Sequence, residues 1–232
     1  MGQIYLIRHG QASFGSADYD ALSALGEEQA RLLGRWFAHA GQRFSCVLSG
    51  DLKRQRQTAA LCMETLYGSD VPVCEVDGGF NEYDHHEVLV RQRPEFADPN
   101  EVRRFLAASA NPRAAFQDVF AAAMSRWMSG RHNAEYGETW PQFSARCVAA
   151  VERLFERGRG QTIAVFTSGG TISAICQRVL GMSDAHTARL SWGLVNSGVT
   201  RLLYQPGQLS LSYLNSYAHL EWQGRADALT WR

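Results

Sequence analysis

The most restrictive feature of the sequence is an apolar run near its start that stops at Arg8-His9-Gly10. Residues 4–7, Ile-Tyr-Leu-Ile, are all strand formers, and such a run is typical of a strand buried inside an α/β sheet. Open α/β sheets bind ligands beyond the carboxyl ends of their strands, so Arg8 and His9 are expected at a ligand site. Gly10 would let the backbone turn or approach a ligand closely. This pair favours phosphate chemistry, although it also fits an ordinary solvated strand end.

Strand-like and helix-like segments alternate along most of the chain. After a polar loop at 11–20, Ser23 can N-cap a helix over about 24–40. The later predicted elements are a strand at 44–48, a helix at 52–67, a strand at 71–76, a helix at 140–157 capped by Thr139, a strand at 162–166, a helix at 171–180 and hairpin strands at 199–204 and 209–215. This alternation predicts the α/β class, with residues 1–232 forming one domain: a three-layer α/β/α sandwich around a mostly parallel central sheet.

Residues 84–136 interrupt this alternation. Three prolines (Pro94, Pro99 and Pro112) punctuate the segment, and its two clearest elements, 101–110 and 114–129, are helical in composition and spacing. We therefore predict a helical insertion that covers one face of the sheet as a cap.

Composition excludes several classes of partner. Lys+Arg and Asp+Glu both number 23, which argues against whole-surface attraction to nucleic acid or anionic membranes. No apolar run approaches the roughly 18 residues that a spanning helix needs. The five cysteines are scattered, and no secretory signal precedes the first strand, so we expect buried free thiols in a soluble, cytoplasmic protein.

A second group of candidate residues opens the helix predicted at 52–67. Lys53, Arg54 and Arg56 fall within four residues. Since successive helical residues point about 100° apart, only one or two of them can face a common site. We predict that Arg54 faces it and that Lys53 and Arg56 are solvated, while a charged surface helix remains the alternative.

A third candidate is the turn at 166–171, where a strand leads through Ser168 and two glycines into a helix. Free backbone N–H groups of Gly169 and Gly170, together with the positive end of the helix dipole, would suit an anion. The turn lacks the pattern of a nucleotide P-loop or a dinucleotide fingerprint, so neither ATP nor NAD is expected. A simple tight connection is the alternative.

The segment at 80–87 offers carboxylates. Glu82 could transfer a proton, and the run from Asp84 to Glu87 could suggest a metal site. The adjacent His85 and His86 would point in different directions on any regular element, so no metal is predicted.

These segments together resemble the histidine phosphatase superfamily, also called the phosphoglycerate mutase-like family. Leu22–Ala30 is close to the family's leucine-threonine-x-x-glycine-x-x-glutamine-alanine, and Gly137-Glu138-Thr139 is similar to its glycine-glutamate-serine. Arg8-His9-Gly10, Arg54 and the strand and turn at 162–171 stand in the family order. The resemblance spans nearly the whole chain.

The resemblance implies a phosphohydrolase that forms a phosphohistidine on His9. Arg8 and Arg54 would hold the phosphoryl oxygens, and Glu82 would be the proton donor, with Asp84 as the second candidate. The partner would be a small phosphorylated substrate, and no metal or cofactor is expected. The oligomeric state is left open.

One departure from the family pattern affects the expected function. Ser168 stands where the family has a second histidine; its hydroxyl and the N–H of Gly169 could still bind a phosphate oxygen. One alternative is therefore a degenerate member that binds a phosphorylated ligand with little turnover. A phosphoglycerate-type mutase is the third possibility, disfavoured because Tyr83-Asp84-His85 does not continue the mutase pattern.

Overall fold

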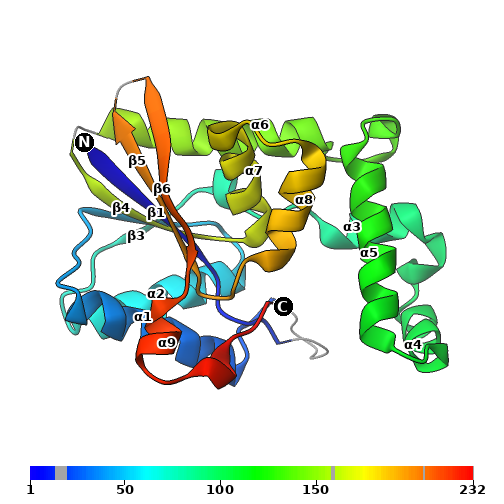
Figure 1. Ribbon diagram of the computed structural model, residues 1–232, viewed down its shortest axis with the longest axis horizontal. Helices are drawn as coiled ribbons and strands as arrows, with labels where there is room; N and C mark the ends of the chain where they lie inside the picture. The colour runs from blue at the N-terminus through cyan, green and yellow to red at the C-terminus, as the bar shows by residue number, and fades with distance from the viewer. Residues whose placement is uncertain (14–19, 158–159, 206, 232) are drawn as a thin grey trace. The chain divides into compact units, whose positions relative to one another are not determined.

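A six-stranded sheet forms the centre of the larger of two compact units. The computed structural model describes residues 1–13, 20–157, 160–205 and 207–231, and divides into Met1–Glu82 with Arg146–Arg232, and Tyr83–Ala145. The strands are β1 (Gly2–Arg8), β2 (Cys46–Ser49), β3 (Cys74–Val76), β4 (Thr162–Thr167), β5 (Val199–Gln205) and β6 (Gln208–Ser216). Their order across the sheet is β3-β2-β4-β1-β5-β6 (Figure 1).

Four neighbouring strands run parallel. β1 pairs with β4, β4 with β2, and β2 with β3, whereas β5 and β6 are antiparallel to their neighbours. Arg8 lies opposite Thr167, and Ser49 lies opposite Phe166, so β1, β4 and β2 end at the same edge. The predicted α/β class with a mostly parallel sheet is confirmed.

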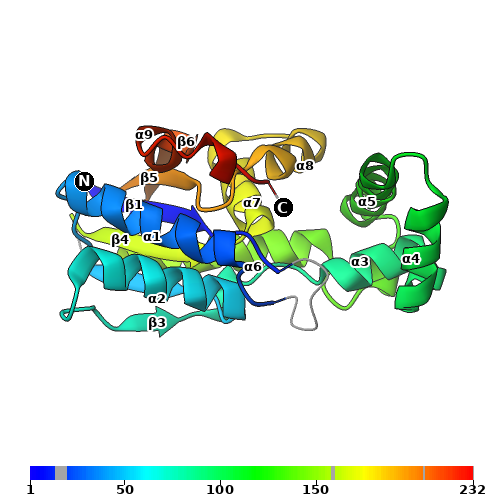
Figure 2. The ribbon, with the colours of Figure 1, turned by 90° about the horizontal axis from the view of Figure 1, so that it is seen from below.

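Helices cover both faces of this sheet. In the larger unit they are α1 (Ala24–His39), α2 (Lys53–Tyr67), α6 (Trp140–Arg153, which begins in the smaller unit), α7 (Gly169–Leu180), α8 (Asp184–Gly193) and α9 (Ala218–Trp222). α1 and α2 lie side by side on one face (Figure 2), and α6 and α7 lie on the other (Figure 1). This gives the three layers predicted from the sequence.

The alternation of side chains in β1 connects these layers. Tyr5 and Ile7 pack with Leu33 and Phe37 of α1 and Met63 of α2 in one buried cluster. Because successive strand residues point to opposite faces, the even-numbered residues of β1 point toward the α6 and α7 layer. Both faces of β1 are thereby buried, which explains its continuous apolar run.

The smaller unit consists of helices and an aromatic cluster. Its own helices are α3 (His85–Gln92), α4 (Pro99–Ala108) and α5 (Pro112–Met128). Within the unit, the rings of Tyr83, Trp127, Trp140 and Phe143 meet in tilted or edge-to-face pairs, with ring centroids 4.9–5.8 Å apart. The predicted insertion at 84–136 falls inside this unit, and its role as a cap stays a prediction.

Some element boundaries differ from those predicted. α3 was not expected; it forms because the Asp84 carboxylate accepts hydrogen bonds from the backbone N–H groups of His86 and Glu87. α8 and α9 were also missed, β3 is shorter than the predicted strand at 71–76, and α7 begins at Gly169. Of the predicted loop at 11–20, residues 14–19 lie outside the described residues.

Two of the remaining expectations concern thiols and the membrane. All five cysteines are free thiols in the structure; Cys62, Cys147 and Cys176 are buried as predicted, whereas Cys46 and Cys74 are half-buried. No helix in the described ranges is long and apolar enough to cross a membrane. The cytoplasmic location stays a prediction.

A close contact between two glycines fixes the chain that leaves β1. A Cβ added at Gly10 would lie 2.3 Å from the carbonyl oxygen of Gly26, and one at Gly26 would lie 2.1 Å from that of Gln11. Gln29 strengthens this contact by accepting a hydrogen bond from the Gln11 N–H at 2.8 Å, and Ser23 caps α1 as predicted. The start of α1 therefore holds Gly10 and Gln11, which follow β1.

A buried polar pair links α9 to the loop between α8 and β5. Nε2 of His219 lies 2.7 Å from Oγ of Ser197, and both residues are almost inaccessible to solvent. Burial lowers the pKa of His219 from 6.5 to about 3. His219 is therefore neutral in the folded protein at physiological pH, consistent with a structural role.

The glycine contact predicts a steric cost for Gly26→Ala. The new methyl group would collide with backbone atoms, which cannot move as a flexible side chain can, so we expect a loss of about 1–3 kcal/mol of unfolding free energy. Chemical denaturation measures this loss. Gly193→Ala is the matched control, because a Cβ there meets nothing within 4 Å; equal stabilities of the two variants would contradict the prediction.

The buried His219 predicts a pH-dependent stability. Since its folded-state pKa is below the unfolded value of 6.5, its stabilisation is complete above pH 6.5 and is lost as the pH falls toward 3. His219→Gln should reduce the slope of unfolding free energy between pH 6 and 4 by up to about 1.4 kcal/mol per pH unit. Denaturation at several pH values tests this, with His186→Gln, on exposed α8, as the control. Parallel curves for His219→Gln and the native protein would refute it.

Candidate functional site

The candidate residues meet where β1, β4 and β2 end. The His9 N–H donates to the carbonyl oxygen of Thr167 at 2.9 Å, and the Gly50 N–H donates to that of Phe166 at 3.0 Å, which continues the parallel pairing beyond the strands. Arg8 and His9 point to opposite faces because they are consecutive in an extended chain. His9 therefore points toward α2, and Arg8 points toward α7 and α8.

His9 is buried, with 7% of its surface exposed, and both ring nitrogens have partners. Nδ1 lies 2.7 Å from the carbonyl oxygen of Gly10, which can only accept, so Nδ1 carries the proton. Nε2 accepts a hydrogen bond from Nε of Arg54 at 3.1 Å. Burial, and then the charges of Arg54 and Arg8, hold the pKa of His9 well below 6.5, although the Gly10 hydrogen bond opposes this. His9 is thus neutral, with its lone pair on Nε2.

Arg54 comes from the first turn of α2. It is 7% exposed, whereas Lys53 and Arg56, predicted to be solvated, are exposed. Besides its contact with His9, Arg54 donates from Nη1 to Oδ1 of Asp20 at 2.5 Å. The start of α2 thus delivers one buried cation to the nucleophile candidate.

Arg8 reaches the opposite side of the same strand end. Its Nη1 donates to the backbone carbonyl of Leu194, which precedes β5. A Cβ added at Gly169 would lie 3.5 Å from Arg8 Nε, so the first residue of α7 lies against the guanidinium. Arg8 and Gly169 are therefore neighbours, as the sequence analysis expected of two residues at one sheet edge.

The turn before α7 holds Ser168 in a polar network. Ser168 is fully buried, and its Oγ accepts a hydrogen bond from Nε2 of Gln55 at 2.8 Å. The Gly170 N–H, one of the first donors of α7, binds Oε2 of Glu82 at 3.0 Å. Glu82 and the turn therefore come together, and α7 already directs one N–H at an anionic group.

The segment after Glu82 makes no metal cluster. In the ranges that the structure describes, no group of three or more His, Cys, Asp or Glu side chains could hold a metal ion. Asp84 instead caps α3 with its carboxylate. The carboxylate of Asp84, the second candidate for the proton donor, is therefore already engaged as a helix cap.

Several supporting residues were missed by the sequence analysis. Asn196 donates from Nδ2 to the carbonyl oxygen of His9 at 3.2 Å, and the Ser197 N–H donates to the same oxygen. Thr230 donates to Oδ1 of Asn196 at 3.0 Å. These neutral side chains give no charge signal and are about 190 or more residues from β1. Gln55 could have been predicted as a supporting residue, because it directly follows Arg54 in the sequence.

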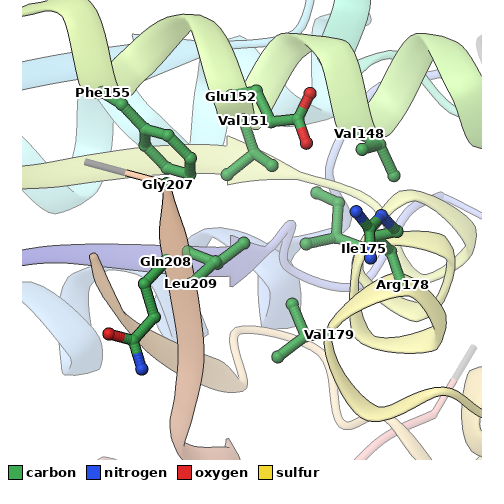
Figure 3. Close-up of a pocket in the computed structure, with 10 residues that line it drawn as sticks. All are labelled: Val148, Val151, Glu152, Phe155, Ile175, Arg178, Val179, Gly207, Gln208 and Leu209. Atoms are coloured by element: carbon green, nitrogen blue, oxygen red, sulfur yellow. The ribbon is translucent and has the colours of Figure 1, made fainter. Parts of the chain in front are cut away.

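The hollow drawn in Figure 3 lies away from this site. It is lined by Val148, Val151, Glu152, Phe155, Ile175, Arg178, Val179, Gly207, Gln208 and Leu209. Gln208 starts β6 beside Gln205, at the amino end of β1, whereas Arg8 is at its carboxyl end. None of the lining residues belongs to the candidate site.

The arrangement has the chemistry of an anion site with a nucleophile. The guanidinium groups of Arg8 and Arg54 approach the end of β1 from opposite sides, and the neutral imidazole of His9 lies at the same strand end. Guanidinium forks match phosphate oxygens in geometry and charge. A tetrahedral oxyanion is the ligand that this set of donors fits best.

Known proteins share this architecture. A structure of a phosphoserine phosphatase from Entamoeba histolytica in complex with phosphoserine has 18% sequence identity and a TM-score of 0.65, covering 95% of this chain and 100% of the other. A phosphoglycerate mutase from Bacillus anthracis gives 19% identity and a TM-score of 0.65, covering 95% of each chain. At these identities the likeness concerns the fold alone.

Comparisons of the sequence are more specific than the likeness of fold. A broad-specificity phosphatase of Saccharomyces cerevisiae is 36% identical over 83 residues, which is 33% of this chain and 36% of the yeast protein. The match thus spans about a third of that relative. The model of the histidine phosphatase superfamily (branch 1) matches residues 4–119 and 107–217. Nearly the whole chain is matched, and it belongs to the histidine phosphatase superfamily.

Proposed function

We propose that the protein is a phosphohydrolase that acts on small phosphomonoesters through a phosphohistidine intermediate on His9. The observation that carries this proposal is the state of the His9 ring. Its Nδ1–H is bound to the Gly10 carbonyl, and Nε2 keeps the lone pair beside the Arg54 guanidinium. A neutral imidazole whose lone pair faces the Arg54 guanidinium is suited to attack a phosphorus atom whose oxygens that guanidinium holds.

In the first step, Nε2 of His9 forms a bond to phosphorus as the bond to the ester oxygen breaks. Arg54 exchanges its hydrogen bond with Nε2 for one with a phosphoryl oxygen, and Arg8 binds from the other side. Positive charge that develops on the ring is stabilised through Nδ1–H by the Gly10 carbonyl. Glu82, as the carboxylic acid, gives its proton to the leaving oxygen.

In the second step, Glu82 acts as a base. Its carboxylate takes a proton from a water molecule as the water oxygen bonds to phosphorus, and the N–P bond breaks to return neutral His9. Glu82 is preferred over Asp84 because it already lies at the start of α7, whereas Asp84 caps α3. Arg8 and Arg54 supply the positive charge, so no metal or cofactor takes part. The free thiols fit a reducing, cytoplasmic compartment.

A second candidate function is binding of a phosphorylated ligand with little turnover. Ser168 favours it, because a neutral hydroxyl that already accepts from Gln55 can give an oxyanion one hydrogen bond but no positive charge. Loss of one electrostatic donor costs on the order of 10²–10³ in rate. The N–H groups at the start of α7 offset part of that loss in the leading proposal.

The role of His9 predicts a covalent intermediate. With an aryl phosphate as substrate and EDTA present, a quench in alkali should trap an acid-labile phosphoenzyme in the native protein and none in His9→Ala. The variant should lose at least roughly 10³-fold in kcat. The exposed His186→Ala is the control. Equal turnover by the native protein and His9→Ala would remove the assignment, and transfer to an added alcohol instead of phosphate release would indicate a mutase.

Ser168 separates the two candidate functions. If the turn contributes one neutral hydrogen bond to catalysis, Ser168→Ala should lower kcat/KM about tenfold, and Ser168→His should match or exceed the native rate. Steady-state kinetics and calorimetry with the same phosphate ester measure turnover and binding. Micromolar binding without detectable hydrolysis in the native protein would instead support the binding function.

A further inference from the structure

Arg54 is held by a carboxylate that no sequence pattern singled out. Oδ1 of Asp20 accepts from Arg54 Nη1 at 2.5 Å, and Oδ2 of the same carboxylate accepts from the Lys53 N–H at 2.7 Å. The Arg54 side chain is 9% exposed and that of Asp20 is 37% exposed. One carboxylate thus bridges the guanidinium and the first backbone donor of α2.

The backbone around Asp20 is itself fixed to α2. Leu22 forms an isolated bridge with Ala12, and the Leu22 N–H donates to Oε1 of Gln57 at 2.8 Å. Ser13 donates to the Leu22 carbonyl at 2.9 Å. These contacts hold Leu22, two residues after Asp20, against α2 and against residues 12 and 13. The ion pair of Asp20 with the buried Arg54 therefore differs from an exposed ion pair, which would contribute little.

The two contacts of Arg54 use different parts of its guanidinium. In a planar guanidinium, Nε and Nη2 share an edge that binds two oxygens side by side, and Nη1 lies outside that edge. Asp20 takes Nη1, and Nε points at Nε2 of His9. The edge suited to a phosphoryl group is thus turned toward the nucleophile while Asp20 holds the other side.

We propose that Asp20 is a positioning residue that orients Arg54 for the phosphoryl group, an inference that rests on the proposed function. The carboxylate keeps its bridge to Lys53 N–H and Arg54 Nη1 when substrate binds. Substrate then meets a guanidinium whose rotation is already fixed, so less ordering is needed on binding and in the transition state.

The opposite role is a carboxylate that competes with phosphate for Arg54. The two roles differ in sign: a competitor must leave before phosphate binds, so its removal tightens phosphate binding, whereas removal of a positioning residue weakens it. The separate edges favour positioning, because Asp20 and a phosphate oxygen do not need the same nitrogen.

The test is phosphate binding and turnover by Asp20→Asn. Titration calorimetry with inorganic phosphate should show about tenfold weaker binding, and kcat/KM for an aryl phosphate should fall roughly 10–100-fold, with kcat reduced as well as KM raised. In the Arg54→Lys background, Asp20→Asn should have no further effect, because the fork that it orients is gone. Thermal unfolding of each variant separates this from loss of the fold.

Asp51→Asn is the matched control. Asp51 also stands at the start of α2 and pairs with an arginine, Arg56, at 3.6 Å, but both side chains are at least 60% exposed. It should bind phosphate like the native protein. Tighter phosphate binding by Asp20→Asn, equal losses in both variants, or additive losses with Arg54→Lys would each overturn the positioning role. A native protein that neither binds inorganic phosphate nor hydrolyses the aryl phosphate would overturn the proposed function, and the inference with it.

Discussion

The parallel pairing of β1 with β4, and of β4 with β2, is the constraint on which the site depends. Side chains far apart in the sequence reach one edge only because these strands end in register, with Arg8 opposite Thr167 and Ser49 opposite Phe166. The Gly10–Gly26 contact then fixes the chain leaving β1. A shift of one residue in β1 would exchange the faces of Arg8 and His9 and separate each from its partners.

Electrostatic balance explains how a buried cation is tolerated at the site. Arg54 is buried beside a neutral imidazole, and its charge is met by Asp20. At the start of α7, the Gly170 N–H is met by Glu82. Arg54 and the Gly170 N–H, two donors that would serve a phosphoryl group, therefore already face acceptors, which limits the cost of burial. The same acceptors determine which contacts a substrate must exchange and which it can leave in place.

Local patterns predicted the layers and the strand ends, because apolar alternation and caps act over a few residues. Helical direction indicated only that one or two of Lys53, Arg54 and Arg56 could face a common site, and the choice of Arg54 agrees with its burial. Contacts between segments that come together only in the folded chain could not be predicted. Asn196 reaches the His9 carbonyl from the far end of the chain and is held by Thr230, and Asp20 lies beside a segment with no strand or helix pattern. Neutral donors of this kind leave no periodicity or charge cluster.

Compared with the second histidine of the family pattern, Ser168 changes the charge of the site more than the number of contacts that the site can make. Its Oγ is joined through Gln55 to α2, the helix that also carries Arg54, so the turn and the cation share one support. Arg8 and Arg54 carry two positive charges, which match the two negative charges of a phosphate dianion before Asp20 and Glu82 are counted. The start of α7 then adds about half a positive charge, where a protonated histidine would add a full one. Burial is the largest cause of the low pKa of His9, ahead of the charges of Arg54 and Arg8, so His9 stays neutral without a further cation at position 168. The substitution thus weakens attraction for the phosphoryl group while leaving the state of the nucleophile intact.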